Sequence, residues 1–338
     1  MQPRWACLAL IALLGACTAK AQADGSGRHA ITISAQTIEL NPQAPGQTQI
    51  GAFAYAGGLA LTSPDGQRLG GLSDMVIDAT GALTAISDEG GLLQAKVLTG
   101  PDGQFSGLDQ AQIAPVLGQD GSALPSKFEA DAEGLALWPN GDLMVSFEHD
   151  HRIWLYPAAG GAPQTLPMPD VPIPPNDGME GLSLAPSQGL DAYWVGVEAG
   201  SIWLCHIKAD CKAYPSLPMP PQGYRLSGLR EGPDGQLFIL HHSWNRAQGS
   251  RLVLSVISDP AGPAPKRVQT LSLAPPLSTD NFEGLAITKA ANGTLRIYLL
   301  SDDNFSKTQR TLLMAFDLPP PARPWVLGSI QIWWGDAD

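Results

Sequence analysis

The chain has 338 residues, of which 44% are hydrophobic and 15% charged, so it can bury a sizeable core, and a wholly disordered chain is excluded. Its 37 glycines and 30 prolines are spread along the chain, which is typical of many turns between short strands. The formal net charge of -12 excludes nucleic acid as a partner, because like charges repel. An anionic substrate would need a cation or local arginines.

The N-terminal residues 1–23 have the layout of a secretion signal, with a basic residue, an apolar run and then small residues. Within them, the letters LGAC ending at Cys17 resemble the bacterial lipobox, in which the cysteine is lipidated and becomes the new N-terminus. The alternative is cleavage after Ala23, which would release a soluble protein. Both alternatives predict an exported protein, periplasmic or held in the outer membrane of a bacterium only by its lipid. Residues 24–338 then form a single domain, expected to be a monomer.

Two cysteines lie outside the signal, Cys205 and Cys211. In an oxidising compartment an even pair this close in sequence predicts a disulfide across a tight hairpin. The alternative is two unpaired thiols.

Five stretches of the chain resemble one another. Each has Gly-Leu, a short apolar strand, a turn that contains glycine, a second apolar strand and then polar or acidic residues. This pattern predicts a β-hairpin. A spacing of 47 to 63 residues with only strands inside is typical of β-propeller blades. The Gly-Leu pairs begin at Gly71, Gly134, Gly181, Gly228 and Gly284.

We therefore predict an all-β protein that folds as a six-bladed β-propeller, with five or seven blades as the open alternatives. Residues 24–70 would supply the sixth unit, and residues 29–40 would close the ring against a C-terminal strand. An open solenoid would show shorter, more uniform repeats. A β-sandwich would not show such regular internal similarity.

The innermost strands of a propeller converge on a central channel, so Glu133, Glu180 and Glu283, each directly before a Gly-Leu, would ring the axis. Ionised carboxylates gathered in a low-dielectric channel cost on the order of several kcal/mol each unless they are compensated. Calcium is suited to this because it takes six to eight hard oxygen ligands. The alternative is that each glutamate accepts hydrogen bonds from the backbone of the neighbouring blade, without any metal.

Acidic or polar residues also follow the second strand of the repeats. We interpret six of them as metal ligands: Asp88, Glu89, Glu148, Glu198, Asp303 and Asn304. The candidate catalytic set adds a further carboxylate and one histidine to the three glutamates: Glu133, Glu180, Glu283, Asp302 and His241. In the fourth repeat His241 and His242 occupy the place of an acidic strand end, so one of them could line the channel as acid or base.

Three arginines follow acidic loops and precede strands, namely Arg152, Arg251 and Arg310. A guanidinium can hold two phosphate oxygens, so these are candidate substrate-binding residues; the alternative is that they pair with nearby carboxylates and hold the blades in register. His149 and His151 are a possible transition-metal pair if the strand continues through them, whereas a turn at Asp150 would separate them.

Several motifs together resemble the bacterial phytase-like family, described by "esterase-like activity of phytase": GGLSDM, EADAEGLAL, SFEHDHRIWLYP, GMEGLSLA, NFEGLAI and YLLSDDNFSKTQRTLLMAFDL. The resemblance covers nearly the whole mature chain, and more distantly Glu-Gly-Leu is similar to parts of calcium-dependent β-propeller phytases. The chain departs from the Glu-Gly-Leu pattern in the first repeat, which has no Glu before Gly-Leu, and in the fourth repeat, which has LSGL.

The resemblance implies an exported hydrolase that uses Ca²⁺ to act on small-molecule phosphate monoesters or other esters. Two alternatives stay open at this point. One is a non-catalytic binding or scaffold propeller of the cell envelope, stabilised by calcium, and the other is a lactonase-like enzyme.

Overall fold

The computed structural model describes residues 27–64, 69–217 and 221–320, so the predicted signal and Cys17 lie outside the described residues. Strands dominate these ranges, and their one α-helix is the short α1 (Lys127–Ala130). In the same ranges no helix is both long enough and apolar enough to cross a membrane. The all-β class predicted from the sequence is confirmed.

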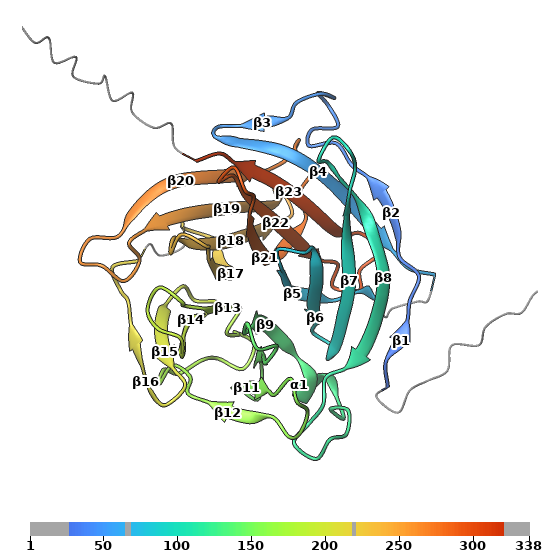
Figure 1. Ribbon diagram of the computed structural model, residues 1–338. Helices are drawn as coiled ribbons and strands as arrows, with labels where there is room; N and C mark the ends of the chain where they lie inside the picture. The colour runs from blue at the N-terminus through green and yellow to red at the C-terminus, as the bar shows by residue number, and fades with distance from the viewer. Residues whose placement is uncertain (1–26, 65–68, 218–220, 321–338) are drawn as a thin grey trace, which may run out of the picture.

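Five antiparallel sheets are arranged as blades around a common centre, with β5, β9, β13, β17 and β21 innermost (Figure 1). Blade 1 contains β5 (Leu72–Ile77), β6 (Ala82–Ser87), β7 (Gly91–Thr99), β8 (Phe105–Pro115) and β1 (His29–Ala30); blade 2 contains β9 (Ala132–Leu137), β10 (Leu143–Phe147), β11 (Arg152–Tyr156) and β12 (Gln164–Leu166). Blade 3 contains β13 (Gly181–Leu184), β14 (Ala192–Gly196), β15 (Ile202–His206) and β16 (Ala209–Ala213); blade 4 contains β17 (Arg225–Glu231), β18 (Leu237–Asn245), β19 (Gly249–Ser258) and β20 (Lys266–Leu273). Blade 5 contains β21 (Asn281–Lys289), β22 (Leu295–Asp302), β23 (Thr311–Leu318), β4 (Phe53–Thr62), β2 (Ser34–Thr37) and β3 (Gln49–Ile50).

The ring closes with five blades. Each innermost strand contacts the innermost strand of both neighbouring blades, and the series returns from β21 to β5. The β-propeller is therefore confirmed, but the expected count of six blades was wrong. Residues 24–70 form no blade of their own, because their described strands complete blades 1 and 5.

The N-terminal and C-terminal parts of the chain close the ring by pairing β4 with β23, in the register Leu61↔Thr311 and Ala60↔Leu312. The closing strand is thus residues 53–62 and not the predicted 29–40. The reason is burial: the C-terminal part of the chain supplies three strands of blade 5, and the fourth must fill an apolar interior. β4 is mostly buried, whereas every residue of β2 is exposed, so β2 can only add to the outer edge of β4.

Each of the five interfaces between blades has its own hydrophobic cluster. Between blades 3 and 4, for example, Trp194 packs with Leu226 and Ile239, and all three are almost fully buried. Complete burial of such side chains contributes about 1.5–3 kcal/mol each. The outer hairpin of blade 3 is further joined by the disulfide between Cys205 and Cys211, six residues apart in the sequence.

A single arginine connects the innermost strands. Arg230, on β17, donates from Nε to the Leu285 carbonyl at 2.9 Å and from Nη1 to the carbonyls of Leu135 and Leu182 at 2.8 and 3.1 Å. Its Nη2 lies 2.9 Å from Oδ2 of Asp74 on β5. We call Asp74 and Arg230, both buried, the axial pair.

The carboxylate of the axial pair accepts backbone hydrogen bonds in its turn. Asp74 Oδ2 accepts from Leu135 N at 2.9 Å, and Oδ1 accepts from Leu285 N at 3.2 Å and Met75 N at 2.8 Å. Through these bonds the axial pair contacts all five innermost strands. It fills the centre of the ring at this level, so the molecule has no open channel there.

Replacing Arg230 with methionine removes the partner of a buried carboxylate and a donor to four carbonyl groups, those of Met75, Leu135, Leu182 and Leu285. Because breaking a buried pair strands a charge, we expect Arg230→Met to lower the free energy of unfolding by about 3–5 kcal/mol, measured by urea denaturation at pH 7. The control is Lys289→Met, which breaks the partly exposed pair with Asp234 and should cost less than about 1 kcal/mol. Equal losses in the two variants would contradict the role of the axial pair.

Candidate functional site

Each blade contributes one side chain from its innermost strand to a single cavity on one side of the axial pair. In four blades the innermost hairpin has a β-bulge, which leaves one residue without a partner across the pair of strands and turns its side chain out of the sheet. In blade 3 the corresponding residue directly precedes β13. These five residues are Ser73, Glu133, Glu180, Ser227 and Glu283, and all of them line the cavity.

A second side chain from each blade comes from the end of the next strand. The two sets of five surround a cavity of about 310 Å³, which we call the acidic cavity. The second set is Asp88, Glu148, Glu198, His242 and Asp302.

The bulge also corrects the alignment of the first repeat. Ser73 is the unpaired residue of blade 1, so it occupies the position of Glu133 and Glu283, and Asp74 occupies the position that Gly134 has in blade 2. Aligning on the Gly-Leu of Gly71 therefore places blade 1 three residues out of register. This is why blade 1 lacks a glutamate in the first set, and why it can supply the carboxylate of the axial pair.

The structure brings together eight of the residues predicted from the sequence. Those that line the acidic cavity are Asp88, Glu133, Glu148, Glu180, Glu198, Glu283, Asp302 and Asn304.

Three other predicted residues lie outside this cavity. Glu89 lines a separate cavity beside Gly90 and Phe305. Asp303 accepts hydrogen bonds from Gly71 N at 3.1 Å and Phe305 N at 3.0 Å, so it links blade 5 to blade 1. His241 is fully buried, with burial lowering its pKa to about 4, and its neighbour His242 lines the cavity in its place.

None of the three predicted arginines lines the acidic cavity. Arg152 donates to the carbonyl of Asp150 and lies 3.9 Å from the ring centroid of Phe147. Arg251 donates to Ser243 at 3.1 Å, and Arg310 pairs with Asp280 at 3.3 Å. Each of these contacts lies within one blade; Arg310 pairs with a carboxylate, as the alternative expected, whereas Arg251 contacts a hydroxyl group.

Sequence reasoning missed Lys127, Asp131 and Asn176, which line the cavity, and Arg225, which pairs with Glu198 in its wall. His149, expected as one of a pair with His151, also lines the cavity. Lys127, in α1, is paired with Asp88 at 2.5 Å and with Asp131 at 3.3 Å. Its spacing of four residues from Asp131 is a signal that could have been used. Arg225 pairs through Nε with Glu198 at 2.5 Å. Glu198 precedes it by 27 residues, so no local sequence pattern predicts this pair.

The carboxylates at the centre of the cavity repel one another. Burial raises the pKa of Glu133, Glu180 and Glu283 well above the usual range, and each is raised further by a neighbouring carboxylate. Burial also raises the pKa of Asp302 to about 7. Among the described residues, no basic side chain forms an ion pair with any of these four.

One oxygen in the cavity wall is unsatisfied. Asp88 Oδ2 faces Lys127, but Oδ1 is buried and has no hydrogen-bond partner. Gly71 is required beside it, because its φ is +66° and a Cβ there would lie 2.0 Å from Asp88 Oδ1. A buried carboxylate oxygen without a donor among the described residues is a position where a water molecule or a cation can bind.

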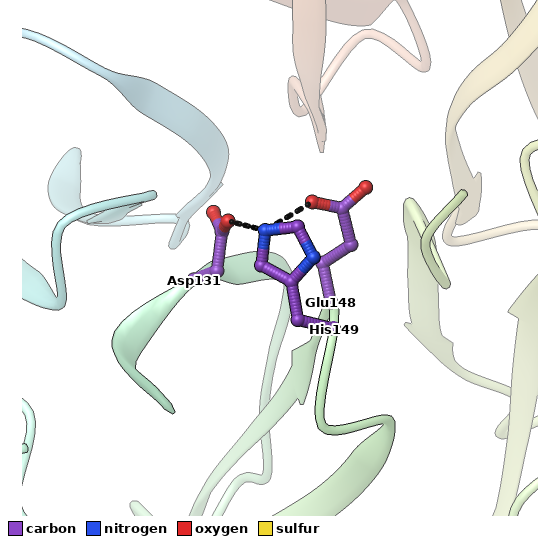
Figure 2. A group of neighbouring side chains, drawn as sticks. All are labelled: Asp131, Glu148 and His149. Atoms are coloured by element: carbon purple, nitrogen blue, oxygen red, sulfur yellow. Dashed lines mark ion pairs between the residues drawn. The ribbon is translucent and has the colours of Figure 1, made fainter. Parts of the chain in front are cut away.

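Asp131, Glu148 and His149 form the one group of three His, Cys, Asp or Glu side chains in the described structure whose ligand atoms all lie within 4.8 Å of one another. Figure 2 shows the imidazole between the two carboxylates. His149 Nε2 lies 3.0 Å from Asp131 Oδ2 and 3.5 Å from Glu148 Oε2. The predicted pair of His149 and His151 is not assembled, because His151 Nε2 instead lies 3.2 Å from the Pro174 carbonyl.

Solved structures with a similar fold include virginiamycin B lyase from Staphylococcus aureus, at 15% identity over 80% of this chain and 90% of that chain, with a TM-score of 0.40. A gluconolactonase from Xanthomonas campestris is also similar, at 15% identity over 73% of this chain and 72% of that chain, with a TM-score of 0.40. At these values the likenesses bear on neither substrate nor mechanism. No curated protein matches the sequence.

A protein-family comparison is more informative. Residues 67–305 match the family model described as "Phytase-like: Esterase-like activity of phytase". The matched range begins before the first predicted repeat and ends after Asn304, so it contains every carboxylate of the acidic cavity. Because it spans well over half of the sequence, the chain belongs to the phytase-like family.

Proposed function

We propose that this protein is a calcium-dependent hydrolase that acts on phosphate monoesters or other small esters in the acidic cavity. The observation that carries the proposal is the convergence in one cavity of four carboxylates whose pKa is raised and which have no basic ion-pair partner among the described residues, Glu133, Glu180, Glu283 and Asp302. Membership in a family described by esterase-like activity supports it.

The residues of the cavity fit calcium. Carboxylates and the Asn304 amide offer only hard oxygens, which calcium prefers, and they come from several blades, so they can surround an ion. Glu133, Glu180 and Glu283 would hold the ion, together with the Oδ1 of Asp88 that has no hydrogen-bond partner among the described residues. When bound, calcium would supply polarisation of a phosphoryl or acyl oxygen.

The chain's own groups supply the proton transfer. Asp302 has a pKa of about 7, which suits a general base or acid near neutral pH, and its carboxyl lines the cavity where a water molecule can approach. Lys127 places a positive charge at the wall beside Asp88, where it can attract an anionic substrate.

We further propose that the protein acts outside the cytoplasm as a monomer, attached to the membrane through a lipid on Cys17. The support is the signal-like sequence of residues 1–23 and the disulfide between Cys205 and Cys211, a bond that persists in oxidising compartments.

The raised pKa of Asp302 makes the stability of the protein depend on pH. The pKa of Asp302 rises from the ordinary 3.8 to about 7 on folding, so between these values the folded state keeps a proton that the unfolded chain has lost. Stability therefore falls as pH rises through this window. In protein treated with a chelator we expect Tm to fall by about 5 °C between pH 5 and pH 8, and to fall less in Asp302→Asn. A Tm that is flat or rises with pH in both proteins would contradict the charge repulsion.

Bound calcium should stabilise the folded protein. Calcium at about 100 times its Kd should stabilise the protein by about 2.7 kcal/mol, or raise Tm by about 4 °C in a chain of this size. Glu180→Gln should raise Tm in chelator, because it removes a repulsive charge, and should lose most of the calcium shift, because it removes a ligand. Glu89→Gln, outside the cavity, is the control and should behave as the parent protein. A calcium shift that is equal in both variants would contradict the ligand assignment.

A hydrolase with this site should turn over ester substrates and should depend on Asp302. With calcium supplied, we expect hydrolysis within a panel of phosphate monoesters, carboxylic esters and lactones, and a loss of about 10²–10⁴-fold in kcat for Asp302→Asn. Turnover of lactones alone would favour the lactonase-like alternative. No turnover across the panel, with the calcium shift intact, would replace the hydrolase by a calcium-stabilised binding propeller.

A further inference from the structure

Asp131, Glu148 and His149 are held in place by the innermost hairpin of blade 2. Asp131 directly precedes β9, and the other two directly follow β10. The amide of Glu148 donates to the carbonyl of Asp131 at 2.8 Å, so the two ends of the hairpin are joined at this point. All three side chains line the acidic cavity, and Figure 2 shows them turned toward one another.

Contacts from outside the group fix the orientation of the imidazole. His149 Nδ1 lies 2.7 Å from the Pro175 carbonyl oxygen, and because a carbonyl can only accept, Nδ1 carries the hydrogen. Nε2 is then the nitrogen that faces Asp131 and Glu148. The ring stacks on Phe128, with centroids 5.2 Å apart and planes at 3°. A ring nitrogen bonded to a backbone carbonyl is the usual support of a metal-binding histidine.

The distances from His149 Nε2 to the two carboxylates fit a small ion, and the three ligand atoms all lie within 4.8 Å of one another. Two ligands at about 2.0–2.1 Å from a metal, at tetrahedral angles, lie about 3.3 Å from each other. The separations of 3.0 and 3.5 Å from Nε2 to the two carboxylates are close to this value. Imidazole is a good ligand for zinc and its first-row neighbours, whereas calcium prefers oxygen alone.

We propose that Asp131, Glu148 and His149 Nε2 bind a divalent transition ion of the zinc type, with one coordination position open to the acidic cavity. Three protein ligands with an open position is the arrangement of catalytic zinc sites. The proposal goes beyond the function proposed above, because it assigns a second cation of a different kind. Eight acidic residues and a single lysine line the cavity, so one calcium ion leaves negative charge for another cation.

Cobalt(II) tests the site, because it replaces zinc and its visible absorption reports an imidazole-containing, tetrahedral environment. The purified protein, cleared of metal and then saturated with calcium, is titrated with cobalt(II) and afterwards with zinc. We expect one cobalt(II) ion per chain with visible bands, displaced by zinc. His149→Ala should bind cobalt(II) at least tenfold more weakly and lose the bands. His151→Ala, two residues along and outside the cavity, is the matched control and should bind as the parent does.

Circular dichroism establishes that each variant is folded. If His149→Ala does not fold, Glu148→Gln takes its place, with the same expected loss of affinity. Absence of cobalt(II) binding in the parent, or equal affinity in the histidine variants, would overturn the proposal and leave His149 as an ion-pair partner of Asp131 and Glu148. The Glu180→Gln calcium measurement is separate: loss of the calcium shift there with cobalt(II) binding intact leaves this site standing, and the reverse leaves the calcium site standing.

Discussion

The axial pair is the interaction on which the arrangement of the blades depends. Five strands converge on one line, and their backbone groups near the axis have no strand on their inner side to pair with. Arg230 can satisfy several of them at once because a guanidinium has five N–H donors in one plane, whereas a lysine has three donors on a single point charge. Asp74 offsets its charge and accepts hydrogen bonds from three backbone amides, so each buried ion has hydrogen-bond partners.

The acidic cavity follows from this filled centre. Side chains just above the axial pair cannot point into an open channel, so those turned out by the bulges collect between the pair and solvent. There the fold holds like charges close together at a cost in stability, and the hydrophobic clusters between blades offset that cost. Natural proteins accept such costs at sites that bind or react.

The sequence predicted the class of fold and much of the site, because the hairpin repeat and the residues at its ends are local patterns. Glu133 and Asp302 could be placed in the cavity by repeat position alone. The number of blades could not be predicted in this way, since β4 belongs to blade 5 through pairing with residues some 250 positions away. The choice of His242 over His241 could have been made from spacing, because His242 follows Gly228 by 14 residues, as Glu148 follows Gly134. Arg225 contacts Glu198 across the interface between blades 4 and 3. Lys127 lies in a helix outside the repeat, so repeat position could predict neither residue.

Ring closure by β4 has a consequence for how the chain is made. β4 is synthesised early and can pair at once with β2 and β3, but its other partner, β23, is the last described strand, so until then one edge of this largely buried strand stays open. Exposed strand edges of this kind are templates for aggregation, and contacts so distant in sequence form slowly. The ring therefore cannot lock before its C-terminal strands are available, and the pairing that closes it forms only after most of the chain has been made.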